Sequence, residues 1–153
     1  MNFSADTSFL LSYGALPAAL SDPDIKSVKK LLKDYSILYL NEEIKAEALT
    51  KNIEGFTRFL FALAADSSKY LDLTKISKNA AVPRQTTQRF FEILEDTLIV
   101  KRVDAFAKSE KRRLIQHPRF FIFENGVLNA LLGNFNCSVD RRGFLFETLS
   151  LSL

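Results

Sequence analysis

Residues 74–123 of this chain combine two helical patterns, a tight turn between them and two apolar runs that can pair. The letters TKISKNAAVPRQTTQRFFEILED are followed by TLIVKRVDAF and, after a basic stretch, by RFFIF. Two short helices that meet at a corner and are followed by a hairpin form a winged helix-turn-helix. The sequence therefore predicts this arrangement, with the corner at residues 82–84, the paired runs at 98–103 and 119–123, and a wing of two or three strands.

The spacing of apolar residues predicts which side of each of these helices is buried. In the first helix the inward positions are Leu73, Ile76, Ala80 and the turn residue Val82. In the second helix Thr87, Phe91 and Leu94 recur at i, i+4 and i+7 and point inward. Phe90 and Ile93 flank them on the same side. Pro83 stands just before the second helix, where its missing N–H is tolerated because first-turn N–H groups have no partner inside a helix.

The opposite side of the second helix carries polar side chains suited to base recognition. They are Arg84, Gln85, Gln88, Arg89 and Glu92. Arginine can pair with guanine through two hydrogen bonds, and glutamine can pair with adenine in the same way. We therefore predict that Arg84, Gln85, Gln88 and Arg89 contact a DNA groove. Glu92 argues mildly against this, because a carboxylate repels phosphate unless it accepts from a cytosine amino group.

The net charge of +3 is unevenly distributed along the chain. Residues 101–119 hold seven Lys or Arg side chains and two acidic ones, so this stretch carries +5 and the rest of the chain −2. Cationic side chains beside a recognition helix would contact phosphates and release counterions. The predicted phosphate contacts are Lys108, Lys111, Arg112 and Arg113. The alternative interpretation is a solvated hairpin tip, because charged runs are usually exposed to water.

Composition favours a mainly α-helical (α+β) protein. The 153 residues are 47% hydrophobic, which suffices for one core or two very small ones, and five glycines and four prolines favour helices joined by short loops. We expect a helical N-terminal segment at 1–69, the winged helix-turn-helix at 70–123 and a short helical tail at 124–153.

Apolar periodicity predicts helices on both sides of the winged helix-turn-helix. A helix capped by Asp24 has the inward positions Val28, Leu31, Leu32, Tyr35, Leu38 and Tyr39. A second long helix, from about 42 to 65, has the inward positions Ile44, Ala48, Ile53, Phe56, Phe59, Leu60 and Leu63. Farther along, an extended run stops at 124–125, turns at Gly126 and resumes as a short helix that ends at Gly133. Residues 144–153 fit a strand or a helix, and we favour a helix.

Few residues offer catalytic or metal-binding chemistry. One cysteine and one histidine exclude an internal disulfide and a zinc site with the usual number of ligands. Cys137 is interpreted as a small, partly buried structural residue, because no histidine is near it in sequence. The glutamates within residues 42–47 could suggest acid catalysis or a metal. Without a neighbouring histidine or aspartate they are interpreted as a solvated surface or as ion pairs with Lys45 or Lys51. We expect neither cofactor nor metal.

No apolar run approaches the roughly 20 residues that a membrane span requires. The apolar N-terminal letters FLLSYGALPAAL lack a basic region before them and contain Gly14 and Pro17, so they are interpreted as part of the fold and not as a signal peptide. A single cysteine fits a reducing compartment, and we expect a cytoplasmic protein without membrane contact.

Several motifs in a fixed order carry a family resemblance over nearly the whole chain. They are YGALPAAL, LKDYSILYLNEEI, FTRFLFALAA, the helix-turn-helix, EILEDTLIV, KRR, RFFIFENGVLNALLG and GFLFETL. In this order the chain resembles the region that follows the ATPase core in a family of predicted prokaryotic AAA+-type ATPases.

The resemblance implies a non-catalytic, C-terminal fragment of such an ATPase. Family members begin with a nucleotide-binding domain, but the chain contains no GxxxxGK[ST] loop to hold phosphates, so it is expected neither to bind nor to hydrolyse ATP. Family members continue into a part that resembles the restriction-endonuclease fold. Glu147 matches the glutamate that opens this part, and Glu124 stands where relatives more often have aspartate.

Three functional hypotheses follow. The first is a module that binds double-stranded DNA through the second helix and the basic wing. The second is an interaction module that packs on an ATPase domain or on a second copy of the chain. The third, an enzyme remnant, is the weakest, because neither a phosphate loop nor a complete set of metal-binding carboxylates is present.

Overall fold

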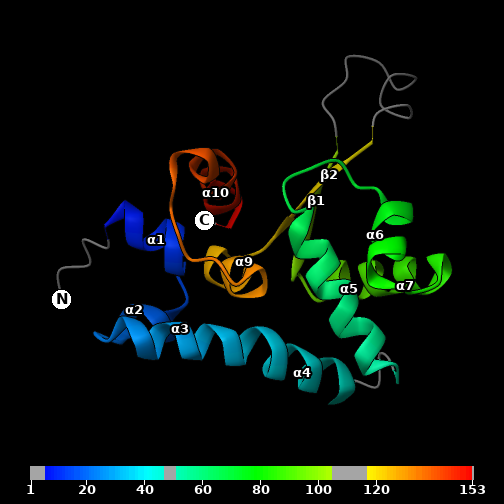
Figure 1. Cartoon of the computed structure of the whole chain (residues 1–153), viewed down its shortest axis with the longest axis horizontal. Coiled ribbons are helices and arrows are strands. Elements are labelled where there is room, and N and C mark those ends of the chain that lie inside the picture. The colour runs from blue at the N-terminus through cyan, green and yellow to red at the C-terminus, as the bar shows by residue number, and fades with distance from the viewer. Residues whose placement is uncertain (1–5, 47–50, 105–116, 153) are drawn as a thin grey trace. The chain divides into compact units, whose positions relative to one another are not determined.

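The computed structural model describes residues 6–46, 51–104 and 117–152. These residues are mainly helical and include a two-stranded antiparallel sheet, which confirms the predicted α+β class (Figure 1). Contacts divide the chain into two compact units. Unit 1 comprises Met1–Lys51 with Phe123–Leu153, and unit 2 comprises Asn52–Ile122. Unit 2 is thus inserted in sequence between the two parts of unit 1, and the boundary expected after residue 69 falls within unit 2.

Unit 1 is a helical assembly with a buried helix at its centre. Its elements are α1 (Thr7–Tyr13), α2 (Pro17–Ser21), α3 (Ile25–Asp34), the π-helical turn η1 (Tyr35–Tyr39), α4 (Leu40–Ala46), α9 (Asn125–Leu132) and α10 (Val139–Ser152). Helix α9 contacts α1, α3, η1 and α10, and its residues 125–131 are all buried (Figure 1). The C-terminal residues form the helix α10, which confirms the prediction favoured for them.

The ends of these helices follow local capping chemistry. Asp24 caps α3 as predicted, with its carboxylate accepting from the backbone N–H of Ser27 at 3.1 Å. Gly133 ends α9 in the left-handed conformation, also as predicted. The turn predicted at Gly126 is wrong, because this glycine lies inside the first turn of α9. A side chain there would collide with the carbonyl of Tyr13, so the absence of a Cβ lets α1 and α9 approach.

The long helix made by α3, η1 and α4 contains one π-helical turn. The backbone N–H of Leu40 bonds to the carbonyl of Tyr35, five residues earlier. Ser36 is buried within this turn and donates to the carbonyl four residues before it at 2.6 Å. Ser36 follows the buried Leu32 by four residues and is itself buried, as is Leu40 after the wider turn, whereas Leu38 is 62% exposed. The inward position predicted for Leu38 is therefore wrong.

A buried polar network joins α1, α9 and α10. Asn129 donates to the carbonyls of Leu11 and Ser12 at 3.0 and 2.9 Å. Its own side-chain oxygen accepts from Arg141 at 2.7 Å, and Arg141 also donates to the carbonyl of Asn134 at 2.8 Å. These bonds satisfy carbonyls near the end of α1 that have no partner inside that helix.

Unit 2 contains α5 (Ile53–Ala65), α6 (Leu73–Ala80), α7 (Arg84–Asp96), β1 (Val100–Val103) and β2 (Arg119–Ile122). The single helix predicted from 42 to 65 is wrong. Helix α4 ends at Ala46, and α5 begins after Asn52, whose side chain caps it by accepting from the N–H of Gly55 at 3.0 Å. Among the residues predicted to face inward, the side chains of Tyr39, Ile44 and Ala48 lie outside those that the structure describes.

The hairpin predicted from the sequence is present. Strands β1 and β2 pair antiparallel, with Val100 opposite Ile122 and Val103 opposite Arg119. On the other edge of β2, Tyr70 forms an isolated bridge with Arg119, and the N–H of Ser68 donates to the carbonyl of Phe120 at 2.8 Å. Strand β2 is therefore bonded on both edges, by β1 and by the segment that leads into α6.

Aromatic side chains fill the core of unit 2. The ring of Phe90 from α7 packs edge-on against Phe56 of α5 at a centroid distance of 5.2 Å and lies 5.5 Å from Phe59. Phe91 of α7 packs edge-on against Phe120 of β2 at 5.9 Å. Neighbouring residues of α7 thus anchor it to α5 and to the sheet, which fixes the orientation of its outer face.

Candidate nucleic-acid interface

Helix α7 is held at a defined angle to α6 by the short corner between them. The carboxylate of Asp72 caps α6 by accepting from the N–H of Lys75 at 2.9 Å. Helix α6 ends at Ala81 in the left-handed conformation, and Pro83 precedes α7 without a side-chain cap, as predicted. Thr87 is buried and donates to the carbonyl of Pro83 at 3.1 Å. Local hydrogen bonds therefore fix the corner between α6 and α7, and the first turn of α7 follows it directly.

The outer side of α7 carries the side chains predicted for base recognition. The buried residues of this helix are Thr87, Phe90, Phe91, Ile93 and Leu94, as the spacing predicts. The exposed residues include Arg84, Gln85, Gln88, Arg89 and Glu92. The structure thus brings together all four predicted groove contacts of this helix on one solvent-exposed surface.

Two hydrogen bonds connect side chains along this surface. Arg84 donates to the side-chain oxygen of Gln88 at 3.4 Å, and the amide nitrogen of Gln88 donates to Glu92 at 3.0 Å. Both bonds lie between exposed groups, where water competes and each contributes little. They orient Gln88 along the helix axis, and a ligand that reaches Gln88 would replace them.

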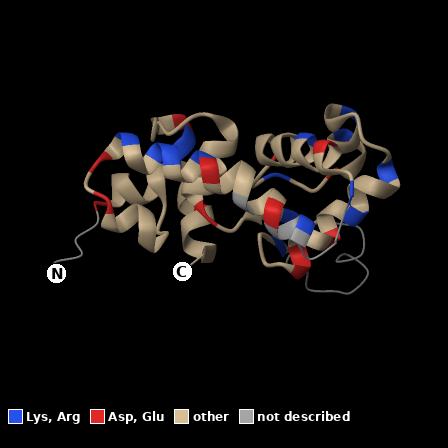
Figure 2. Ribbon diagram, turned by 90° about the horizontal axis from the view of Figure 1, so that it is seen from below, with Lys and Arg blue, Asp and Glu red and all other residues tan. Residues whose placement is uncertain are grey.

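The predicted wing contacts Lys108, Lys111, Arg112 and Arg113 lie outside the described residues. The strands that lead toward them carry further charge, since Lys101 and Arg102 are exposed on β1 and Arg102 forms an ion pair with Asp104 at 3.3 Å. Figure 2 shows basic and acidic positions interspersed along the ribbon of unit 2.

A groove of about 490 Å³ lies beside the first turn of α7. Arg84 of α7, Arg102 of β1 and His117 before β2 line it, so three separate segments contribute basic side chains. Thr74 near the start of α6 also lines it, together with Tyr70, which is 67% exposed, and with Asp72, whose carboxylate is engaged in capping α6. Hydroxyl, guanidinium and imidazole groups are donors to phosphate, and an exposed aromatic ring offers a surface for stacking.

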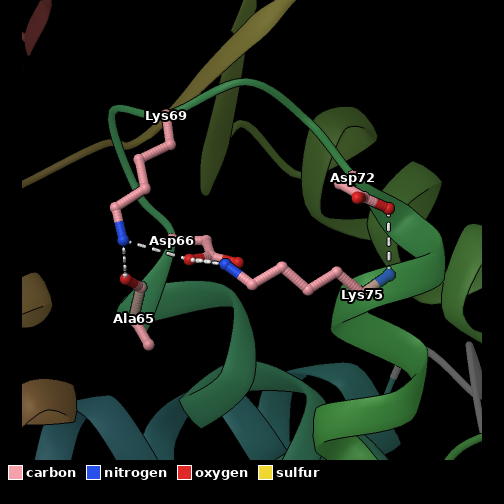
Figure 3. A network of polar contacts seen from close by, with 5 residues as sticks. All are labelled: Ala65, Asp66, Lys69, Asp72 and Lys75. Carbon is pink, nitrogen blue, oxygen red and sulfur yellow. Dashed lines mark hydrogen bonds and ion pairs between the residues drawn. The ribbon is translucent and has the colours of Figure 1, made fainter.

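An acidic hub fixes the segment that enters α6. Figure 3 shows the side chains of Lys69 and Lys75 converging on Asp66, at 3.1 and 2.8 Å from its carboxylate. Asp66 is 6% exposed. Burial alone would raise the pKa of this carboxyl, but the hydrogen bonds from Lys75 and Lys69 outweigh it and hold the pKa below its usual value. The hub therefore ties the end of α5 to α6 through the segment between them.

The described residues do not assemble a metal site, because they contain no group of three His, Cys, Asp or Glu side chains that could hold an ion. Cys137 is a free, partly buried thiol, as predicted. Glu42 forms a long ion pair of 3.9 Å with Lys45, in agreement with a solvated surface. Glu147 is exposed on α10. None of the helices in the described ranges combines the length and the apolar character needed to cross a bilayer.

Residues 4–138 match the model of a family described as a domain of unknown function, DUF8612. The chain belongs to the DUF8612 family. The match covers the whole of unit 2 and most of unit 1, and it ends at the residue before α10. No curated protein and no solved structure matches the chain.

In this DUF8612 protein, sequence patterns located the surface of α7 but missed the groove. The periodicity of an amphipathic helix separates Arg84 and Gln88 from the buried side without further information. Tyr70, Arg102 and His117 join Arg84 only because the segment before α6 and the strand β1 flank β2. A prediction that placed residues 68–71 as a third strand would have brought these residues together.

Proposed function

We propose that unit 2 is a winged helix-turn-helix that binds double-stranded DNA, with α7 as its recognition helix. The order of α5, the segment at 68–71, α6, α7, β1 and β2 is that of a winged helix, and β2 lies between the other two extended segments. The fold alone does not define a function, since the same arrangement also packs against proteins. The proposal therefore depends on the chemistry of the exposed surface.

The observation that carries the proposal is the exposed set Arg84, Gln85, Gln88 and Arg89 on the side of α7 that faces away from the core. A single helix fits the major groove, and these side chains can donate to or accept from base edges there. Their backbone is rigid, because Phe90 and Phe91 anchor α7 to α5 and to β2.

The groove beside α7 would hold a backbone phosphate. In the proposed complex, Arg102 and His117 donate to phosphate oxygens beside Arg84, the first of the base contacts of α7. The predicted wing residues would add contacts farther along the duplex. The net charge of +5 between residues 101 and 119 supports this, because phosphate contacts supply most of the affinity of such modules.

A protein-interaction module is the second candidate. Glu92 lies on the same exposed side of α7 as the arginines, and Leu98 directly after α7 is 79% exposed. An acidic group and a large apolar one suit a protein surface better than a phosphate backbone. We rank this candidate second, because the exposed apolar residue Leu98 is flanked by the polar residues 95–97 and does not form a broad patch with them.

The link to AAA+-type ATPases is proposed from the sequence resemblance alone. The chain would correspond to the region that follows the ATPase core, and its role would be non-catalytic. The DUF8612 match describes a domain of unknown function and has no bearing on this link.

Fluorescence anisotropy with a labelled duplex tests the DNA proposal. We expect the full chain to bind at low salt and to lose affinity linearly in log–log form as salt increases. The double variant Arg84→Ala with Arg89→Ala should weaken binding by about tenfold or more, since each base contact contributes about 1–3 kcal/mol. Arg142→Ala, an exposed arginine on α10 of unit 1, is the matched control and should bind within about twofold of wild type. Absence of binding at low salt would overturn the proposal and favour the interaction module.

A further inference from the structure

One side of the long helix in unit 1 remains exposed although it is partly apolar. A shallow groove of about 650 Å³ runs along it, lined by Leu31, Tyr35 and Leu38 and flanked by the charged residues Lys30, Asp34 and Glu42. These residues come from α3, η1 and α4 in turn, so the groove follows the helix axis. An apolar strip with charged borders is typical of a helix that packs on another helix.

Helix spacing explains why Leu38 lies in this groove. Leu38 follows Leu31 by seven residues and Tyr35 by three, so these three side chains share one side of the helix, which is not the side of Val28 and Leu32. On the buried side, Ser36 donates to the carbonyl of Val127 in α9 at 3.4 Å, while Leu38 is 62% exposed. The π-helical turn lies in the same part of the helix, and such turns are often found at functional positions.

Charge changes sign along the same helix. Before Ser36 the helix carries four lysines and Asp34, and after it come Glu42, Glu43 and Lys45. Within the chain Lys30 pairs with Asp34 at 2.8 Å and Glu42 with Lys45 at 3.9 Å, but all four groups are exposed, so these pairs can exchange partners. Lys30 and Glu42 both border the groove, and each is six residues from Ser36. A second helix with the same sequence, laid antiparallel with its Ser36 opposite Ser36, would therefore bring each Lys30 beside a Glu42.

We propose that the groove along α3, η1 and α4 binds a second copy of this chain in an antiparallel, two-fold symmetric pair. Leu31, Tyr35 and Leu38 form the apolar centre, and Lys30 of each copy pairs with Glu42 of the other. A two-fold axis makes the surface complementary to itself, so each ion pair occurs twice. The proposal concerns unit 1 and is independent of the DNA binding proposed for unit 2.

The pair is expected to be weak. A single helix side covers less than the roughly 800 Å² per partner that is usual for a stable complex. Association should therefore be in the range of about 1 µM or weaker, and sedimentation velocity of the full chain over about 1 µM to 1 mM will detect it. We expect the mass to rise from monomer to dimer across this range.

Two leucine variants test the apolar centre. Leu38→Glu places a charge in the groove at an exposed position, so the fold should be retained, as checked by circular dichroism, and dimerisation should be lost. Leu98→Glu is the matched control, because Leu98 is an exposed leucine of unit 2, and it should dimerise as wild type does. A monomer at all concentrations, or a dimer unaffected by Leu38→Glu, would overturn the proposal.

A charge-reversal experiment tests the antiparallel register. Lys30→Glu alone and Glu42→Lys alone each create two repulsive pairs and should weaken dimerisation by about fivefold or more. An equimolar mixture of the two variants restores both attractive pairs, so the mixture should form heterodimers with an affinity close to wild type. If mixing fails to restore association, residues 30 and 42 do not meet, and the proposed arrangement is wrong.

Discussion

The carboxylate of Glu124 accepts a hydrogen bond from the backbone N–H of Ala15 at 2.6 Å, across 109 positions of the chain. The same side chain caps α9 by accepting from the N–H of Val127 at 3.0 Å. Gly14, with φ of +77°, allows this approach, because a Cβ at that position would overlap the carboxylate. Glu124 therefore closes unit 1 by joining its N-terminal and C-terminal segments.

Replacing Glu124 by alanine tests this closure. Glu124→Ala leaves the backbone N–H groups of Ala15 and Val127 without their acceptor, and unit 1 should lose about 2 kcal/mol in free energy of unfolding. Glu147→Ala is the control, since Glu147 is an exposed glutamate of α10, and its effect should stay within about 0.5 kcal/mol. Urea denaturation followed by circular dichroism measures both. Equal effects of the two variants would show that the Glu124 contacts contribute nothing specific.

Asp66 gives unit 2 a stability that depends on pH. Its pKa is lowered in the folded state, so the folded protein binds this proton less readily than the unfolded chain. The contribution is fully present above the unfolded pKa, about 3.9, and is lost as pH falls through the lower folded value. Asp66→Asn should therefore cost about 1 kcal/mol at pH 7 and much less near pH 2 to 3.

The control for Asp66 is Asp104→Asn, which removes an exposed ion pair with Arg102. An exposed pair of this kind contributes little, so its loss should change the free energy of unfolding by less than about 0.5 kcal/mol at either pH. Urea denaturation at pH 7 and at about pH 2 to 3 gives the free energy of unfolding of both variants. A cost for Asp66→Asn that stays constant down to pH 2 would contradict the role assigned to the ion pairs of Asp66 with Lys69 and Lys75.

Leu98 offers a site where stability can be increased. It follows the last turn of α7 with φ of +60°, and the N–H groups of Leu98 and Ile99 bond to the carbonyls of Glu95 and Leu94 as in a Schellman motif. Glycine adopts this conformation without strain, and Leu98 is exposed, so little packing is lost. Leu98→Gly should raise the melting temperature and add about 0.5–1 kcal/mol of stability.

Gly133 provides the reverse test, because it ends α9 at φ of +64° with open space around it. Gly133→Ala meets no neighbour and changes only the backbone preference, so it should lower stability by about 1 kcal/mol. If Leu98→Gly increases stability and Gly133→Ala decreases it, the left-handed backbone conformation is the cause of both effects. Stability changes of the same sign in both variants would exclude the left-handed conformation as the cause.

The features predicted from the sequence are those that depend on local periodicity. The buried side of α7, the corner before it and the β1–β2 pairing follow from residue spacing within 74–123. The inward position of Leu38 was wrong because the predicted stripe joined two sides of the helix, that of Val28 and Leu32 and that of Leu31 and Leu38. The burial of Ser36 could not be predicted, because it depends on α9, a segment about ninety residues away. The interruption between α4 and α5 could not be predicted either, because apolar residues of the sequence continue at helical spacing from one helix to the next.

The groove beside α7 gives the most discriminating test of the proposed DNA interface. Arg102 would contact phosphate, whereas Gln88 would contact a base, so their alanine variants should behave differently. Arg102→Ala should weaken binding about equally for all duplex sequences and reduce the slope of log affinity against log salt by about 1. Gln88→Ala should leave the slope unchanged and alter which sequences are preferred. Lys33→Ala, an exposed cation of α3 in unit 1, removes the same charge at a distance in sequence from the groove and should change neither. If Arg102→Ala and Lys33→Ala lower affinity equally, binding reflects total charge, and the groove is not a phosphate site.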